Sequence, residues 1–401
     1  MVVLVASLCG ACSDEDEISI DGGIAIDALA ADVGSDGVVQ DAQSEDTCVP
    51  GSTVAVDMRD AFAAPAVLFG LDNRPANTTC RALPRPTGLA NDPFPQTLLA
   101  TGCFEPSDLR EPVAGLIPYD VNAPLWSDGA VKRRFMMVPD GQRIRVLPDG
   151  DFVLPVGSML FKTFELAGKM LETRFLVRHT DGDWAGYTYV WDQDGKNEAK
   201  LLGDETSTRS IGLQTWQFPS RSACLSCHTE AAGRSLGLEL GQLNGDHTYP
   251  GDRKANQLAT LEHIGLFESA LSPAQYLVRY AAATASSSSL QVRARSYLHS
   301  NCSHCHRPNG LQTEGNLPDI DLRFDVVLAQ TNLINRMPVR GEFGVPGVLL
   351  VKPGAPLQSM LTVRMKTTVA NVRMPAIGST VVDATGVALI NEWIASMQTC
   401  R

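Results

Sequence analysis

Two five-residue segments carry the side chains best suited to chemistry in this sequence. They read CLSCH at 224–228, the first motif, and CSHCH at 302–306, the second motif. Cysteines three positions apart lie on one side of a helical turn, and a histidine in the next position continues that turn. Two such thiols can bond the two vinyl groups of one haem while the imidazole binds its iron. With 10 cysteines and 7 histidines in 401 residues, two copies are not expected by chance.

Other chemistries of paired cysteines fit these segments less well. A zinc site of four cysteines has its pairs about 15 to 20 residues apart, whereas Cys227 and Cys302 are 75 positions apart. A redox dithiol is expected next to a strand–helix–strand unit, which neither motif has. The sequence therefore predicts two covalently bound haem c groups. The predicted attachment and iron-binding residues are Cys224, Cys227 and His228 for the first haem, and Cys302, Cys305 and His306 for the second.

A methionine near the C-terminus is the predicted sixth ligand of the second haem. Met374 precedes a proline and lies 68 positions after His306. It is followed by an apolar stripe of helical spacing, for which Asp383 is the expected N-cap. The order of helix, motif, Met-Pro loop and helix is typical of a small cytochrome c. A thioether ligand favours reduced iron and raises the potential. Packing in the core is the alternative role for Met374.

The first haem has no equivalent methionine, because none occurs between Met170 and Met337. Its sixth position is either open or filled by a side chain from elsewhere, and the sequence does not choose between these possibilities. The two further histidines near the second motif, His299 and His304, are expected to be surface or packing residues. The candidate ligands for the first haem are His263, His247, Lys162, Met159 and Met170.

The elements around the motifs predict a multidomain α+β protein. Residues 169–180 alternate apolar and polar side chains, a turn follows at Asp181–Gly182, and Tyr187, Tyr189 and Trp191 then recur at the period of a strand with an aromatic core face. We expect a β-rich domain, a helical segment with the first haem, and an all-α cytochrome c-like C-terminal domain with the second. Their boundaries are 48–220, 221–285 and 286–401.

The N-terminus indicates export. Residues 1–12 are a short apolar run ending in small residues, as in a signal peptide, and Ala11–Cys12 resembles a lipoprotein cleavage site. Residues 13–47 contain eleven acidic side chains and no Lys or Arg, which predicts a disordered tether. Since the net charge is −12, the remaining chain is close to neutral and gives no reason to expect nucleic-acid binding. We expect a protein of the periplasm, or a lipoprotein of the outer membrane or cell surface, and otherwise a secreted one. Its only link to a membrane would be the N-terminal lipid.

Four cysteines outside the motifs and the signal are expected to form two disulfides in an oxidising envelope. They allow three pairings. We favour Cys80–Cys103, which closes a local loop, together with Cys48–Cys400, which joins the two ends of the folded body.

Between about residues 80 and 398 the sequence resembles a family of uncharacterised bacterial di-haem c-type cytochromes. A related module occurs fused to quinoprotein sugar dehydrogenases. The resemblance implies the same seven haem-binding residues, Met374 included, and no particular substrate. It rests on the stretches IPYDVNAPLWSDGAVKRRFMMVPDG, PVGSMLFKTFEL, WQFPSRSACLSCHTEAAGRSLGLELGQLN, YLHSNCSHCHRPNG and MPAIGSTVVDATGVALINEWI.

These observations predict a di-haem cytochrome that transfers electrons between redox partner proteins in the bacterial cell envelope. Two alternatives remain open at the level of sequence. One is a peroxidase-like oxidoreductase with one open haem site, and the other is an accessory or sensing haem subunit of a periplasmic dehydrogenase. Axial ligation and access to the iron decide among them. No catalytic residue is predicted outside the haem ligands.

Overall fold

The structure is a computed structural model that describes residues 68–77, 79–88, 92–311 and 319–397. The expected signal at 1–12, the tether at 13–47 and the cysteines Cys48 and Cys400 lie outside these residues. The lipoprotein site and the Cys48–Cys400 disulfide therefore stay predictions. Within the described ranges, no helix combines the length and the apolar character that a membrane span requires.

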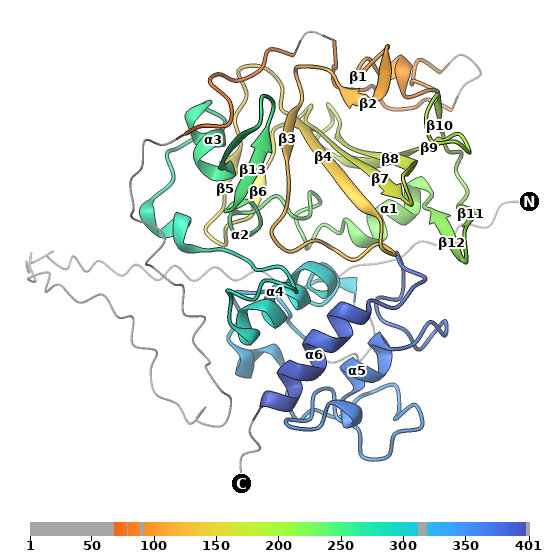
Figure 1. The fold of residues 1–401 in the computed structure, drawn as a ribbon, viewed down its shortest axis with the longest axis vertical. Coiled ribbons are helices and arrows are strands. Elements are labelled where there is room, and N and C mark those ends of the chain that lie inside the picture. The colour runs from red at the N-terminus through yellow and green to blue at the C-terminus, as the bar shows by residue number, and fades with distance from the viewer. Residues whose placement is uncertain (1–67, 78, 89–91, 312–318, 398–401) are drawn as a thin grey trace, which may run out of the picture. The chain divides into compact units, whose positions relative to one another are not determined.

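A six-stranded antiparallel sheet forms the centre of the β-rich part (Figure 1). Its strand order is β10, β9, β8, β7, β4 and β3. The expected strand and turn near Asp181 are present as β8, β9 and their connection. The strands run β3 Ile117–Tyr119, β4 Val131–Met137, β7 Met159–Leu166, β8 Lys169–Arg178, β9 Trp184–Trp191 and β10 Ala199–Leu201.

One face of this sheet packs into an aromatic core. Phe161 of β7, Phe175 of β8 and Tyr189 and Trp191 of β9 are buried there, as the aromatic stripe predicts. Because successive residues of a strand point to opposite faces, the residues between these aromatic side chains point to the other face of the sheet. That second face carries the candidate site.

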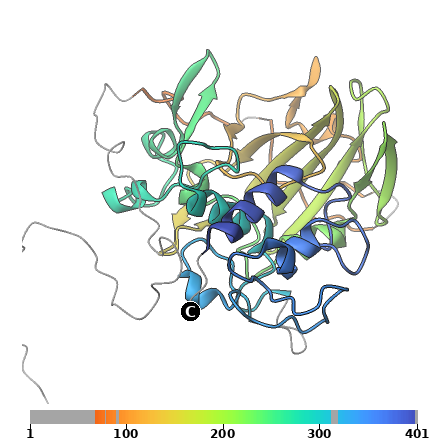
Figure 2. The same ribbon diagram turned by 60° about the horizontal axis from the view of Figure 1, so that its bottom comes forward.

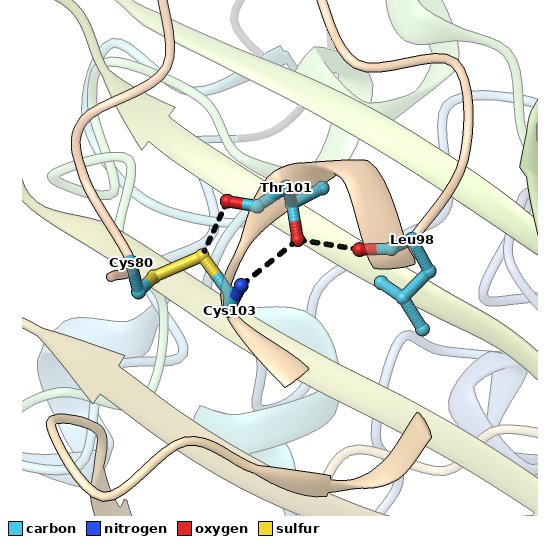
Figure 3. The surroundings of a disulfide bond; sticks show 4 residues. All are labelled: Cys80, Leu98, Thr101 and Cys103. Carbon is cyan, nitrogen blue, oxygen red and sulfur yellow. Dashed lines mark hydrogen bonds between the residues drawn. A yellow bond between two sulfur atoms is a disulfide. The ribbon is translucent and has the colours of Figure 1, made fainter. Parts of the chain in front are cut away.

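The predicted Cys80–Cys103 disulfide belongs to the same core and ties an N-terminal loop to the chain before β1 (Figure 3). The amide of Cys103 donates to the Thr101 hydroxyl oxygen at 3.2 Å, and that hydroxyl donates to the Leu98 carbonyl at 2.6 Å. The short helix η2 Leu99–Thr101 precedes the two-stranded sheet of β1 Phe104–Glu105 and β2 Asp108–Pro112.

The prediction that residues 221–285 form a helical segment is wrong. This segment contains three short α-helices, a short 3-10 helix and also an antiparallel β hairpin. Its apolar side chains, including Leu240, Leu258 and Leu261, pack in one core with Leu160 and Leu176 of the sheet. Its elements are α1 Arg221–Cys227, α2 Leu240–Leu243, β13 Asp246–Tyr249, β14 Arg253–Asn256, α3 Gln257–His263 and η3 Pro273–Leu277. Two further hairpins precede it, β5 Arg145–Val146 with β6 Phe152–Val153 and β11 Ser207–Ile211 with β12 Gln214–Phe218.

The prediction of an all-α cytochrome c-like C-terminal domain is also wrong. The helices α4 Leu290–Cys302, α5 Met360–Met365 and α6 Ala384–Ser396 contain only 13, 6 and 13 residues. Between α4 and α5 the described chain is mostly turns, with short helices at η5 Leu328–Thr331 and η6 Pro356–Gln358 and two isolated parallel bridges. The physical reason is a run of prolines and of glycines with positive φ, such as Gly341, Gly344 and Gly347, which helices do not accommodate.

The expected last helix is correct. Asp383 caps α6 by accepting a hydrogen bond from the Gly386 amide at 2.9 Å. Ile390 and Trp393 are buried against α4, and the two helices lie side by side in both views (Figures 1 and 2). This packing holds the end of α4, where the second motif begins.

Candidate haem site

The first motif lies on α1, directly against strand β9. Ser220 begins the helix by accepting a hydrogen bond from the Ala223 amide at 3.3 Å. One helical turn separates Cys224 from Cys227, so both thiols are on one side. Gly186 of β9 permits this contact, because a Cβ atom at that position would lie 2.5 Å from the Cβ of Cys224. The sheet therefore fixes the helix that carries both predicted attachment cysteines.

A cavity of about 690 Å³ opens beside this helix. Its volume lies in the range of about 300 to 1,000 Å³ that is usual for cofactor sites. Cys224, Cys227 and His228 line it. Apolar and aromatic side chains of the second face of the sheet and its neighbours line it too, namely Leu160, Phe164, Leu176, Trp184 and Trp216. Size, apolar walls and two adjacent thiols fit a covalently bound haem.

The side chain of His228 is held in the form that binds metals. Its Nδ1 lies 2.5 Å from the carbonyl oxygen of Arg234, which can only accept, so Nδ1 carries the proton and Nε2 keeps its lone pair. Arg234 in turn donates from its guanidinium to the His228 carbonyl at 3.0 Å. Burial, with the nearby charge of Lys162, lowers the pKa of His228 to about 3, so the imidazole is neutral.

A row of three cations crosses the second face of the sheet and lines the same cavity. The strand register places Arg134 of β4 beside Lys162 of β7, and Lys162 beside Arg174 of β8. Arg134 pairs with Asp120, and Arg174 with Glu172. Burial lowers the pKa of Lys162 to about 7, and the two arginines add to this effect. Sequence reasoning named Lys162 as a candidate ligand but missed both arginines, because the pairing of β4, β7 and β8 that brings them together is not local in the sequence.

The other candidate ligands of the first haem lie elsewhere. Met159 and Met170 are buried in the aromatic core, on the opposite face of the sheet from Lys162. His263 is exposed and stacks on Phe69, with ring centroids 3.7 Å apart. His247 lies in the β13–β14 hairpin, edge-on to Tyr249. Of the five side chains that the sequence analysis named as candidate ligands of the first haem, only Lys162 lines the cavity.

The second motif touches the first, although 75 positions separate them in the chain. The Thr229 hydroxyl donates to the carbonyl of His304 at 3.0 Å, and the guanidinium of Arg307 donates to the carbonyl of Ala231 at 3.1 Å. The Cys305 sulfur lies 4.0 Å from the Ser226 carbonyl oxygen. The two predicted haem-binding segments therefore form one continuous structure.

The cysteines of the second motif are desolvated thiols at and just beyond the end of α4. Burial raises the pKa of Cys302 to about 12 and that of Cys305 to about 11. His306 follows, and its carbonyl accepts a hydrogen bond from the Leu322 amide at 2.9 Å. His304 is buried and lines the large cavity rather than the surface.

The proposed partner of the second iron, Met374, lies on the loop before α6. Its amide donates to the Arg364 carbonyl at 3.0 Å. With Tyr297 and Val387 it lines a small cavity of about 20 Å³, and His306 is not among the residues that line this cavity. The role of Met374 as an iron ligand stays a prediction.

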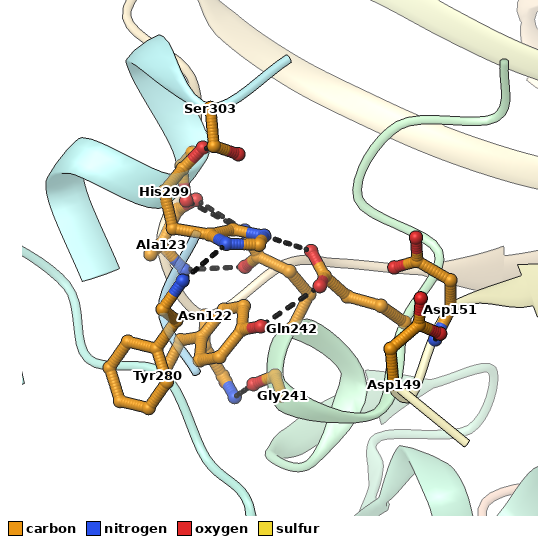
Figure 4. Close-up of polar contacts among 12 residues, drawn as sticks. Asn122, Ala123, Asp149, Asp151, Gly241, Gln242, Tyr280, His299 and Ser303 are labelled. Carbon is orange, nitrogen blue, oxygen red and sulfur yellow. Dashed lines mark hydrogen bonds and ion pairs between the residues drawn. The ribbon is translucent and has the colours of Figure 1, made fainter. Parts of the chain in front are cut away.

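A buried polar cluster, which sequence reasoning missed, borders the cavity (Figure 4). Nδ1 of His299 accepts from the Phe324 amide at 3.0 Å, so its Nε2 carries the proton and donates to Glu239 at 3.1 Å. Tyr280 donates to the same carboxylate at 2.9 Å. Burial, together with Glu239 and Asp149, raises the pKa of the neighbouring Asp151 to about 7. No short sequence pattern marks this cluster, because its members come from distant segments.

Comparisons with protein-family models, with curated proteins and with solved structures find no match for this chain.

Proposed function

We propose that this protein is a di-haem c-type cytochrome that transfers electrons in the bacterial cell envelope. Each bound haem supplies an iron that accepts and releases one electron. The observation that carries the proposal is the contact between the two Cys-x-x-Cys-His segments. The Cys305 sulfur lies beside the Ser226 carbonyl, and Thr229, directly after the first motif, donates to the His304 carbonyl. Electron tunnelling weakens steeply with separation, so a pair of adjacent haem-binding segments suits transfer from one cofactor to the other.

The chain's own residues contribute three functions at the first site. Cys224 and Cys227 present two thiols on a helix whose position is fixed by β9. His228 offers Nε2 to the iron while its other nitrogen is held by the Arg234 carbonyl. Apolar side chains of the cavity wall, such as Leu160 and Trp216, would pack against the haem.

The partners are redox proteins of the envelope. Export delivers the chain to the compartment where haem is attached to such cysteines, and an acylated Cys12 would tether it to a membrane. Apart from the acidic N-terminal segment, the chain is close to neutral, so these partners need not be strongly charged.

The test is a haem count on the denatured full-length protein, expressed in a host that attaches haem c. We expect two haems per chain in the wild type and one in each of two variants, Cys224→Ser/Cys227→Ser and Cys302→Ser/Cys305→Ser. Reductive titration should then take up two electrons per wild-type chain. A protein that holds zinc, or that keeps no haem after denaturation, would overturn the proposal. Rapid consumption of peroxide would instead indicate that the protein is a peroxidase-like oxidoreductase.

A further inference from the structure

We propose that Lys162 supplies the second axial ligand of the haem that the first motif binds. This inference rests on the proposed function, since it presupposes a haem attached to Cys224 and Cys227. It deepens that function, because a haem with two protein ligands transfers electrons, whereas an open one binds small molecules.

The position of Lys162 carries the inference. It occupies the middle of β7, on the sheet face that lines the cavity, while Cys224, Cys227 and His228 line the same cavity from α1 and the residue after it. Lys162 is also the charged group that acts most strongly on the His228 imidazole. The amine and the imidazole thus face one cavity from two different elements, as two ligands of one iron would.

The neighbours of Lys162 are already engaged, but its amine is not. Arg134 pairs with Asp120, Arg174 pairs with Glu172, and the ammonium group of Lys132 donates to the carbonyl of Leu125. Lys162 has no hydrogen bond or ion pair with any residue that the structure describes. Lys162 is half-buried with its side chain lining the cavity, and an amine that is desolvated there without a partner is costly. Coordination of iron by its nitrogen would satisfy it.

One other side chain in the cavity could compete for the iron. His304 is buried there and is an imidazole, the commoner type of metal ligand. Its backbone, however, is bonded to Thr229, the residue directly after His228. The segment that carries His304 is therefore bonded to the chain just after the proximal ligand, whereas Lys162 comes from the sheet. His299, the remaining histidine of the cavity, uses both ring nitrogens in bonds to Glu239 and Phe324.

The first measurement needs no variant. Low-temperature magnetic circular dichroism in the near infrared separates a histidine–amine haem from a histidine–histidine or histidine–methionine one. The oxidised wild type should show one histidine–amine haem per chain. A histidine–histidine spectrum for the first haem would overturn the inference in favour of His304. An open, high-spin first haem would overturn it altogether.

The second measurement tests whether Lys162 coordinates the iron or acts only through its positive charge. Lys162→Arg keeps the positive charge but cannot coordinate iron, because its guanidinium stays protonated. Carbon monoxide bound by the reduced protein should therefore rise by one per chain in both Lys162→Arg and Lys162→Ala. Lys132→Ala is the matched control, since it removes a cation from the same sheet face and should bind no more carbon monoxide than the wild type. Lys162→Met should keep the site closed and raise the potential of the first haem, because a thioether favours reduced iron.

Each outcome has one meaning. If Lys162→Arg binds no more carbon monoxide than the wild type while keeping two haems, Lys162 acts only through its charge and the inference fails. If His304→Ala opens the first haem and Lys162→Ala does not, the ligand is His304. If the wild type does not contain two haems per chain, the proposed function itself is wrong.

Discussion

Replacement of Asp151 by asparagine should make the stability of the folded protein less dependent on pH. The carboxyl group of Asp151 borders the large cavity, beside Glu239 and Asp149, and its pKa rises from 3.8 to about 7 because of burial and these two neighbours. Arg307 and His299 act in the opposite direction but do not cancel the rise. Between about pH 4 and pH 7 the folded protein keeps the proton that the unfolded chain has lost, so the free energy of unfolding falls as pH rises through this window.

The size of the effect follows from the same shift. One pKa unit is worth about 1.4 kcal/mol, which gives about 4 kcal/mol for the full change at Asp151. Asp151 is only half-buried, and solvent screening reduces this to about 2 kcal/mol. Asparagine is neutral at every pH and has nearly the same shape. Asp151→Asn should therefore be about 2 kcal/mol more stable than the wild type at about pH 8, but only about 0.8 kcal/mol more stable at about pH 5, where the unfolded carboxyl has lost its proton and the folded one has not.

The assay is urea denaturation of the haem-loaded protein at both pH values. Asp140→Asn serves as the control, because Asp140 is an exposed carboxyl that is not among the charges acting on Asp151, and its effect should be small at both pH values. A stability difference for Asp151→Asn that is the same at about pH 5 and about pH 8 would refute the reasoning. It would show that Asp151 does not gain its charge in this window.

Three further results are expected. Gly186→Ala should lower the haem count from two to one per chain, because the added Cβ would collide with α1, whereas Gly203→Ala, where nothing lies within 4 Å, should keep two. Loss of the disulfide in a Cys80→Ala/Cys103→Ala variant should reduce the free energy of unfolding by about 3 kcal/mol in urea titrations, and an unchanged midpoint would contradict this. Met374→Ala should abolish the thioether-to-iron charge-transfer band and lower the potential of the second haem; an unchanged spectrum would mean that another residue binds that iron.

Some local structural features of this protein could be predicted from its sequence. A Cys-x-x-Cys-His segment needs only one helical turn to bring its thiols together, and α1 provides that turn. The Cys80–Cys103 disulfide closes a short loop, and the last helix begins at its expected cap. Each feature depends on residues that are close in the chain, so their spacing contains the information.

The irregular C-terminal region shows where such reasoning fails. The apolar stripe after Met374 correctly predicted α6, but it did not predict how the chain between α4 and α6 folds. Glycines and prolines there favour turns, and the loops are held by packing against the helices and by isolated bridges such as Ile334 with Val351. The prediction of an all-α domain followed the helices at its two ends and overlooked the residues that prevent helix formation.

Only the tertiary structure decided how the candidate site is assembled. Lys162 and Met159 are three positions apart on one strand, and both could serve as ligands by residue type. Pleating and the register with β4 and β8 turn Lys162 toward the cavity and Met159 into the opposite core. The contact between Thr229 and His304 likewise joins segments that have no local relationship. Such pairings depend on how distant elements pack, and the spacing of residues in one chain does not encode them directly.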